Sequence, residues 1–260
     1  MTNNSWLSPS GADLSAGYAR HSRTLRGAIR HGLVARALFT HLPTEPQRIL
    51  DIGGGDGHQA VQLARAGHHV TLLDADTTML QLAQERLKGE PEQVRANVVL
   101  VHGRGEHAGD LVGGGFDAAC CHGVLMYCDD PTSLLTQLVA AVRAGGRISV
   151  LAKNATALAM RPALEGRWAD ALEMMDTTTE VGNLGVSSRA DTIPGVRRLL
   201  VDLGATTTKW YGVRVFTDHL GDTPVGEDFD QILEAEWRAG LCEPYRRVAR
   251  LFHIIAQANR

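Results

Sequence analysis

After about residue 50, the hydrophobic residues of the chain follow two patterns that alternate. Short, nearly continuous apolar runs are separated by longer segments in which apolar residues recur at helical intervals. Continuous runs are typical of strands that are covered on both faces, and the wider spacing is typical of amphipathic helices. The alternation therefore predicts an α/β fold with a doubly wound, mostly parallel sheet.

Seven segments have the composition expected of strands, and the last two suggest an antiparallel hairpin at a sheet edge. They cover residues 48–51, 69–74, 97–102, 116–121, 147–152, 205–216 and 250–258. Helices are predicted between and around them, at residues 22–41, 58–66, 77–88, 131–142, 156–175, 194–203 and 229–238. Thr77 is the expected N-cap of its helix, and Gly145 and Gly146 are expected to end the helix that precedes them.

The overall composition excludes some classes of protein. A formal net charge of −3 excludes a chain that binds nucleic acid through its total charge, although a local basic patch remains open. The four cysteines form no CxxC pair and no zinc-ligand spacing, so we expect no metal site and a reduced, cytoplasmic protein. The sequence contains neither a signal-peptide pattern nor an apolar run long enough to span a membrane.

The strongest chemical signal is a glycine-rich loop between the first strand and the next helix. Gly53, Gly54 and Gly55 allow a sharp turn and a close approach of the backbone to a ligand at a helix N-terminus. Asp51 and Asp56 flank these glycines and would repel a pyrophosphate. A sulfonium cofactor with an ammonium group suits such acids, so the loop favours S-adenosylmethionine over a nicotinamide dinucleotide.

Further candidate residues follow the later strands, at the edge where open α/β sheets bind ligands. Asp74 ends the second strand, where an acid can hold both hydroxyls of a ribose. Arg104 and Gly105 follow the third strand, and their loop is expected to border the adenine. His122 follows the fourth strand, where it could touch the cofactor or orient the methyl acceptor.

These features suggest one domain preceded by an arm. Residues 1–18 are rich in Ser, Gly and Asn and are expected to be flexible, and residues 19–260 form the domain. Its parts are the helix at 22–41, a cofactor-binding half at 48–154 and an acceptor-side half at 155–260. Within the second half, the polar, glycine-containing residues 176–185 predict a mobile loop.

Several strings of residues resemble the tRNA 5-carboxymethoxyuridine methyltransferase family, from about Tyr18 to the C-terminus. The glycine loop marks only the class I methyltransferase superfamily, and the C-terminal strings are more specific. The strings are Asp51-Ile-Gly-Gly-Gly-Asp-Gly57, Cys121-His-Gly-Val-Leu125, Ala152-Lys-Asn154, Gly212-Val-Arg-Val-Phe216, Cys242-Glu-Pro-Tyr245 and Arg250-Leu-Phe-His253.

The resemblance implies a class I methyltransferase fold, S-adenosylmethionine as cofactor, and methylation of a carboxylate on the wobble uridine of tRNA. It also implies that Arg26 reaches the methionine carboxylate, that Gly53 and Gly54 line the cofactor, that Asp74 holds the ribose and that His122 completes the pocket. The family is expected to carry a lysine-rich stretch, whereas residues 176–183 here contain no positive charge. Phosphate contacts supply much of nucleic-acid affinity, so this difference favours a small-molecule acceptor.

The acceptor determines which side chains take part in the reaction. A carboxylate is already anionic and needs no base, and Arg214 and Arg250 are the candidates to bind it. An alcohol or amine would need a base, for which His122 and His253 are the candidates. Three functions thus compete: a tRNA methyltransferase, a small-molecule O- or N-methyltransferase, and a non-catalytic protein that binds S-adenosylmethionine.

Overall fold

A seven-stranded sheet forms the centre of the computed structural model, which describes residues 17–18, 20–182 and 185–259. The strand order is β3-β2-β1-β4-β5-β9-β8. The strands are β1 (Arg48–Ile52), β2 (His69–Asp74), β3 (Val98–His102), β4 (Phe116–His122), β5 (Val142–Lys153), β8 (Ala205–Val213) and β9 (Leu251–Ala258). The first five are parallel, and β9 pairs antiparallel with β5 and β8, which confirms the expected fold.

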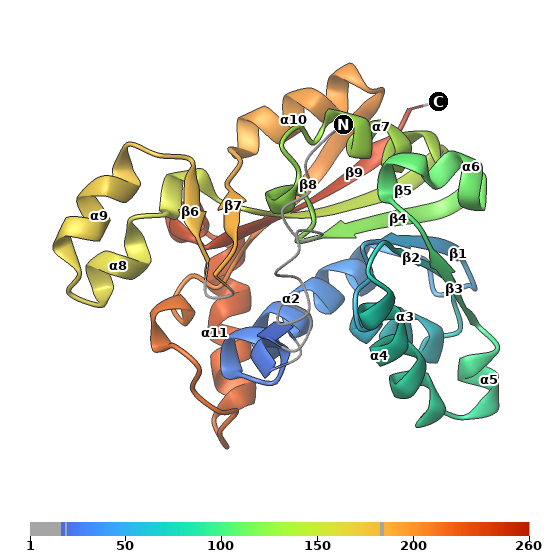
Figure 1. Cartoon of the computed structure of the whole chain (residues 1–260), viewed down its shortest axis with the longest axis horizontal. Helices are drawn as coiled ribbons and strands as arrows, with labels where there is room; N and C mark the ends of the chain where they lie inside the picture. Colours follow the sequence, from blue (N-terminus) through green and yellow to red (C-terminus); the bar gives the residue numbers. More distant parts are fainter. Residues whose placement is uncertain (1–16, 19, 183–184, 260) are drawn as a thin grey trace.

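Helices cover both faces of the sheet (Figure 1). On one face lie α6 (Ala108–Val112), α7 (Thr132–Ala140) and α10 (Ile193–Asp202), and on the other lie α2 (Leu25–His41), α3 (His58–Arg65), α4 (Thr77–Lys88), α5 (Glu92–Arg95) and α11 (Phe229–Leu241). Each face has its own hydrophobic cluster. Neighbouring residues of β2 such as Leu72 and Leu73 belong to different clusters, as expected for a strand that is buried on both sides.

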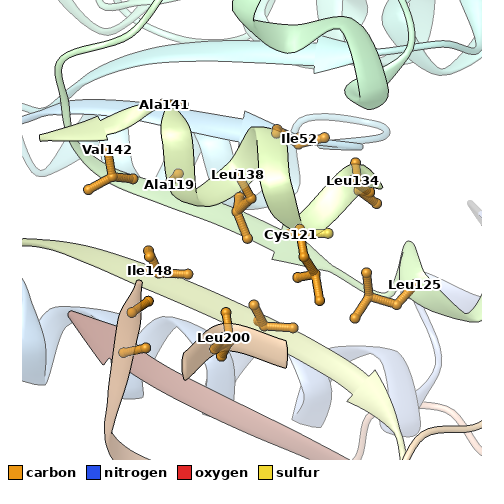
Figure 2. Packing of buried hydrophobic residues seen from close by; sticks show 14 of the residues in the cluster. Ile52, Ala119, Cys121, Leu125, Leu134, Leu138, Ala141, Val142, Ile148 and Leu200 are labelled. Atoms are coloured by element: carbon orange, nitrogen blue, oxygen red, sulfur yellow. The ribbon is translucent and has the colours of Figure 1, made fainter. Parts of the chain in front are cut away.

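The cluster beneath α7 and α10 supplies a test of packing. Leu138 of α7 is fully buried and packs among Ala119, Cys121, Ile148 and Leu200 (Figure 2). Leu138→Ala is expected to lower the free energy of unfolding by about 2–5 kcal/mol, because the side chain leaves a cavity in this cluster. Urea titration measures the change. Val201→Ala, at a site that is 58% exposed, is the control and should stay within about 0.5 kcal/mol of the parent.

Two expected helix boundaries were wrong. The N-cap of α4 is Asp76, not Thr77, because the Asp76 side chain accepts hydrogen bonds from the backbone of Thr78 and Met79. Gly145 and Gly146 do not end a helix: α7 ends at Ala140, and both glycines lie within β5. They form an irregularity in its pairing with β4, where Gly145 adopts a φ of 74°.

The segment after β5 is also more structured than expected. The predicted helix at 156–175 is divided into α8 (Met160–Leu164) and α9 (Trp168–Met175), separated by Gly166 at a φ of 74°. The predicted mobile loop contains β6 (Thr179–Val181), which forms a separate two-stranded sheet with β7 (Ser187–Arg189). Within β6, Glu180 lies between two exposed neighbours and forms ion pairs with the buried side chains of Lys153 and Arg250.

The expected N-terminal arm lies almost wholly outside the described residues, since the structure describes only its last two positions, 17 and 18. No described helix has the length and apolar character needed to cross a lipid bilayer.

Candidate active site

The glycine loop joins β1 to α3 and lines one end of a large cavity. A Cβ at Gly53 would lie 2.3 Å from the Val124 side chain, and one at Gly54 would lie 2.5 Å from that of Leu72. Both positions therefore require glycine. Gly55 has a φ of 58°, and the atom nearest to a Cβ added there would be in the Tyr18 side chain, 3.9 Å away. The loop thus packs tightly on its inner side and leaves the cavity side open to a ligand.

Asp74 lies beside this loop at the end of β2 and lines the same cavity. Its two carboxylate oxygens accept hydrogen bonds of 2.8 Å from the backbone N–H groups of Gly55 and Asp76. Burial raises the pKa of Asp74, while these backbone hydrogen bonds oppose the rise. Each oxygen keeps a further lone pair, so the carboxylate can accept from two neighbouring hydroxyls such as those of a ribose.

The cavity continues from this glycine-loop end to a second end, which we call the cationic end. The glycine-loop end includes Gly53, Gly55, Asp74, Arg104 and Gly105, all of which were expected at a cofactor. The cationic end is formed by Lys153, Arg161, Glu180, Arg214 and Arg250. His122 lines the cavity as well. The structure therefore brings together one region suited to a cofactor and another suited to an anion.

Arg26, expected at the methionine carboxylate, lies elsewhere. Its guanidinium is buried against Asp222 at 2.7 Å and the carbonyl oxygen of Asp218 at 3.3 Å, and it does not line the cavity. Arg30 lies one helical turn further along α2 and does line it. Its guanidinium donates to the Tyr18 hydroxyl at 2.7 Å and to the carbonyl oxygen of His122 at 2.9 Å. The structure therefore places Arg26 away from the cavity, and Arg30 is the arginine of α2 that lines it.

Asp51 lies beneath the loop rather than in the main cavity. Its side chain is buried in β1, and its Oδ2 has no hydrogen-bond partner among the described residues. Burial, together with the nearby Asp74 carboxylate, raises the pKa of Asp51 to about 7. Its unpartnered Oδ2 makes Asp51 a fitting neighbour for an ammonium group held by the loop.

This raised pKa makes folding stability depend on pH. Between its ordinary pKa and about 7, the folded chain keeps a proton that the unfolded chain has lost, so stability falls as pH rises through this interval and levels off above it. Relative to Asp51→Asn, the ligand-free parent should lose about 2 kcal/mol of unfolding free energy between pH 5 and pH 7. Denaturant titrations of both proteins measure this difference, and parallel pH profiles would contradict the assignment.

The cationic end gathers side chains from distant parts of the chain. Lys153 ends β5, Arg161 lies in α8, Arg214 follows β8 and Arg250 precedes β9. Glu180 accepts from Lys153 at 2.8 Å and from Arg250, and it lies 3.8 Å from Arg161. Arg214 and Arg250 were both expected as candidates to bind an acceptor carboxylate, whereas Lys153, Glu180 and Tyr18 were not assigned roles from the sequence.

A second carboxylate, that of Asp218, lies outside the cavity lining and forms ion pairs with the three arginines. It lies 3.3 Å from Arg214, 3.6 Å from Arg250 and 3.8 Å from Arg161. Burial lowers the pKa of Arg214 to about 10, with Arg250 and other cations adding to the effect and Asp218 opposing it. Four cationic side chains against two carboxylates leave this end net positive, so an anion entering it would relieve repulsion.

Comparisons with known proteins agree with this geometry. The family model described as "Methyltransferase domain" matches residues 50–150. The tRNA 5-carboxymethoxyuridine methyltransferase of Escherichia coli K12 is 28% identical over 238 residues, 90% of each chain. The ubiquinone biosynthesis O-methyltransferase of Xanthomonas oryzae is 30% identical over 122 residues, 46% of this chain and 48% of that protein.

Solved structures share the fold. An S-adenosylmethionine-dependent methyltransferase from Methanosarcina mazei matches with a TM-score of 0.59 and 16% identity, covering 85% of this chain and 96% of that one. The 1,6-didemethyltoxoflavin-N1-methyltransferase of Burkholderia thailandensis, solved with S-adenosylhomocysteine, matches with a TM-score of 0.56 and 20% identity, covering 96% and 88%.

The methyltransferase domain and the E. coli relative show that the chain is an S-adenosylmethionine-dependent methyltransferase, and the sheet order and the solved structures show that it has the fold of such enzymes. Its cofactor is S-adenosylmethionine, for which the open face of the loop, Asp74 and the unpaired Asp51 are suited. Within this class, the protein is similar along most of its length to the tRNA 5-carboxymethoxyuridine methyltransferase of E. coli.

Proposed function

We propose that this methyltransferase esterifies a carboxylate, and that its acceptor is 5-carboxymethoxyuridine in tRNA. The observation that carries the proposal is the cationic end of the cavity, where Lys153, Arg161, Arg214 and Arg250 outnumber the carboxylates that neutralise them. Arginine and lysine bind carboxylates through charge-assisted hydrogen bonds. The similarity to the E. coli tRNA enzyme over 90% of both chains supports this choice of acceptor.

Methyl transfer to a carboxylate requires the protein mainly to place the acceptor oxygen against the methyl group. S-adenosylmethionine supplies a methyl group on a positively charged sulfur. An acceptor carboxylate oxygen forms the new bond to the methyl carbon while the carbon–sulfur bond breaks, so no proton is released and no base is required. The cations orient the carboxylate, Asp74 and the glycine loop fix the cofactor, and the two bound reactants displace water from the cavity.

A small anionic metabolite is the second candidate acceptor. Residues 176–182 add no cation to the surface beside the cavity, and Glu180 neutralises part of the positive charge within it. The partial similarity to an O-methyltransferase of ubiquinone biosynthesis supports this candidate as well.

Three measurements separate these candidates. Purified enzyme, labelled S-adenosylmethionine and tRNA carrying 5-carboxymethoxyuridine should yield a methyl ester detectable by nucleoside mass spectrometry. Cells that lack the gene should lose that ester. Binding of tRNA should weaken steeply between low and moderate salt, because phosphate contacts release counterions. An unchanged nucleoside profile would exclude the tRNA acceptor and leave the metabolite.

Glu180 provides a direct test of the charge argument. Glu180→Gln keeps the shape of the side chain and removes its negative charge, so the cationic end becomes more positive. We expect the KM for the carboxylate acceptor to fall by roughly tenfold, since a competing carboxylate is removed. Steady-state kinetics measures the effect, with Glu173→Gln on the exposed side of α9 as a matched control. An increase in KM would mean that Glu180 instead organises the cations for binding.

A further inference from the structure

Three polar side chains on neighbouring strands form a hydrogen-bonded row that leads away from the cavity. They are His122 at the end of β4, Ser149 in β5 and His253 in β9. The Ser149 hydroxyl lies 2.8 Å from Nε2 of His122 and 2.6 Å from Nε2 of His253. Ser149 is 2% exposed and His253 is 0% exposed, so His122 alone in this row reaches the cavity.

The single hydroxyl hydrogen links the protonation of the two rings. Ser149 can donate to only one Nε2, so the other ring must donate its own Nε2 hydrogen to the Ser149 oxygen. In one arrangement His122 carries its hydrogen on Nε2 and donates it to Ser149, so its Nδ1 has a lone pair and no hydrogen. In the other arrangement His122 carries its hydrogen on Nδ1. Both rings are neutral, because burial lowers the pKa of His253 to about 3, and burial, His253 and Arg30 hold the pKa of His122 well below its usual range.

His253 determines which arrangement forms. Its Nδ1 is buried and has no hydrogen-bond partner among the described residues. A hydrogen on that nitrogen would be an orphaned donor in the core, and orphaned buried N–H groups are rare in folded proteins. The hydrogen of His253 therefore lies on Nε2 and is donated to Ser149, which in turn donates to Nε2 of His122. This leaves the hydrogen of His122 on Nδ1.

We infer that Ser149 and His253 are positioning residues that hold His122 as a neutral Nδ1–H donor at the cavity. A ring in this state can donate a hydrogen bond from Nδ1, and its one ring-nitrogen lone pair, on Nε2, is occupied by the Ser149 hydroxyl, so the ring offers no free base. This state suits an acceptor that arrives already ionised, as a carboxylate does. The assignment of the hydrogen rests on the geometry of the row, whereas this consequence for the acceptor also rests on the proposed function.

Nuclear magnetic resonance tests the hydrogen positions without any substrate. Protein labelled with 15N-histidine and recorded by two-bond 1H–15N correlation should show His122 protonated on Nδ1 and His253 protonated on Nε2. Both patterns should persist from pH 6 to pH 8, and the spectra of His122→Asn and His253→Asn assign the signals. A His122 ring with its hydrogen on Nε2, or one that titrates within this range, overturns the inference.

Kinetics then tests whether the row matters for acceptor binding. Ser149→Ala removes the group that donates to Nε2 of His122, so the His122 hydrogen is free to move to Nε2 and a lone pair faces the acceptor carboxylate. We expect the KM for tRNA carrying 5-carboxymethoxyuridine to rise about tenfold, while affinity for S-adenosylhomocysteine changes less than twofold. Ser149→Thr keeps the hydroxyl and should restore most of the loss. Thr207→Val, which removes another buried hydroxyl on a strand, is the control.

The outcomes separate this inference from the proposed function. An unchanged KM in Ser149→Ala overturns the positioning role in acceptor binding. If the parent shows the expected hydrogen positions but methylates only an alcohol or an amine, the carboxylate proposal fails and the assignment of the His122 hydrogen stands.

Discussion

Replacing Arg250 with glutamine is expected to lower kcat/KM for a carboxylate acceptor by about a hundredfold. Arg250 is 5% exposed, contacts Glu180 and Asp218, and has a buried Nη1 without a partner among the described residues. Its side chain lines the cavity, so an incoming carboxylate can pair with the guanidinium. Its removal also leaves the two resident carboxylates less compensated, which further repels an anion.

The effect should appear mainly in acceptor binding. Steady-state methyl transfer to tRNA carrying 5-carboxymethoxyuridine measures kcat and KM, and calorimetry with S-adenosylhomocysteine should give an unchanged Kd. Arg247→Gln is the matched control, because that side chain is 73% exposed and pairs with Glu243 at the surface. Equal kcat/KM values for Arg250→Gln and the parent would rule out an anion site at this end of the cavity.

Asp74→Ala should weaken S-adenosylhomocysteine binding by about a hundredfold. The change removes the carboxylate proposed to accept from the ribose hydroxyls, and hydrogen bonds to a charged group are each worth about 1.5–3 kcal/mol. It also removes the acceptor of the Gly55 N–H, so the glycine loop loses one of its supports. Calorimetry measures the Kd directly.

Asp74→Asn refines this prediction. Its amide oxygen can still accept from Gly55, so the loop keeps its support while the charge is lost, and an intermediate Kd is expected. Asp110→Ala, at an exposed position of α6, serves as the control. If Asp74→Ala bound the ligand as tightly as the parent, the ribose assignment would be wrong.

Local patterns were sufficient to predict much of the fold from the sequence. The bounds of β2 and α4 match their predicted ranges, because a continuous apolar run and a helical repeat are each read from neighbouring residues. The glycine loop was found for the same reason, since its conformation depends on residues that lie next to one another. Asp74 was found from its distance along the chain after that loop.

What the sequence did not predict depends on partners far apart in the chain. Arg26 and Arg30 lie one turn apart on α2, and only the positions of Asp222 and Tyr18 decide which of them turns to the cavity. Glu180 lies in a polar segment with the composition of a loop, and its partners Lys153 and Arg250 are 27 and 70 residues away. Patterns among neighbouring residues carry no information about such distant partners, so the cationic end could be identified only from the three-dimensional structure.

The two ends of the cavity come from different halves of the chain. The glycine loop, Asp74 and Arg104 all precede β5, whereas Arg161, Glu180, Arg214 and Arg250 all follow it. Substitutions after β5 can therefore reshape the acceptor site while the cofactor pocket stays intact.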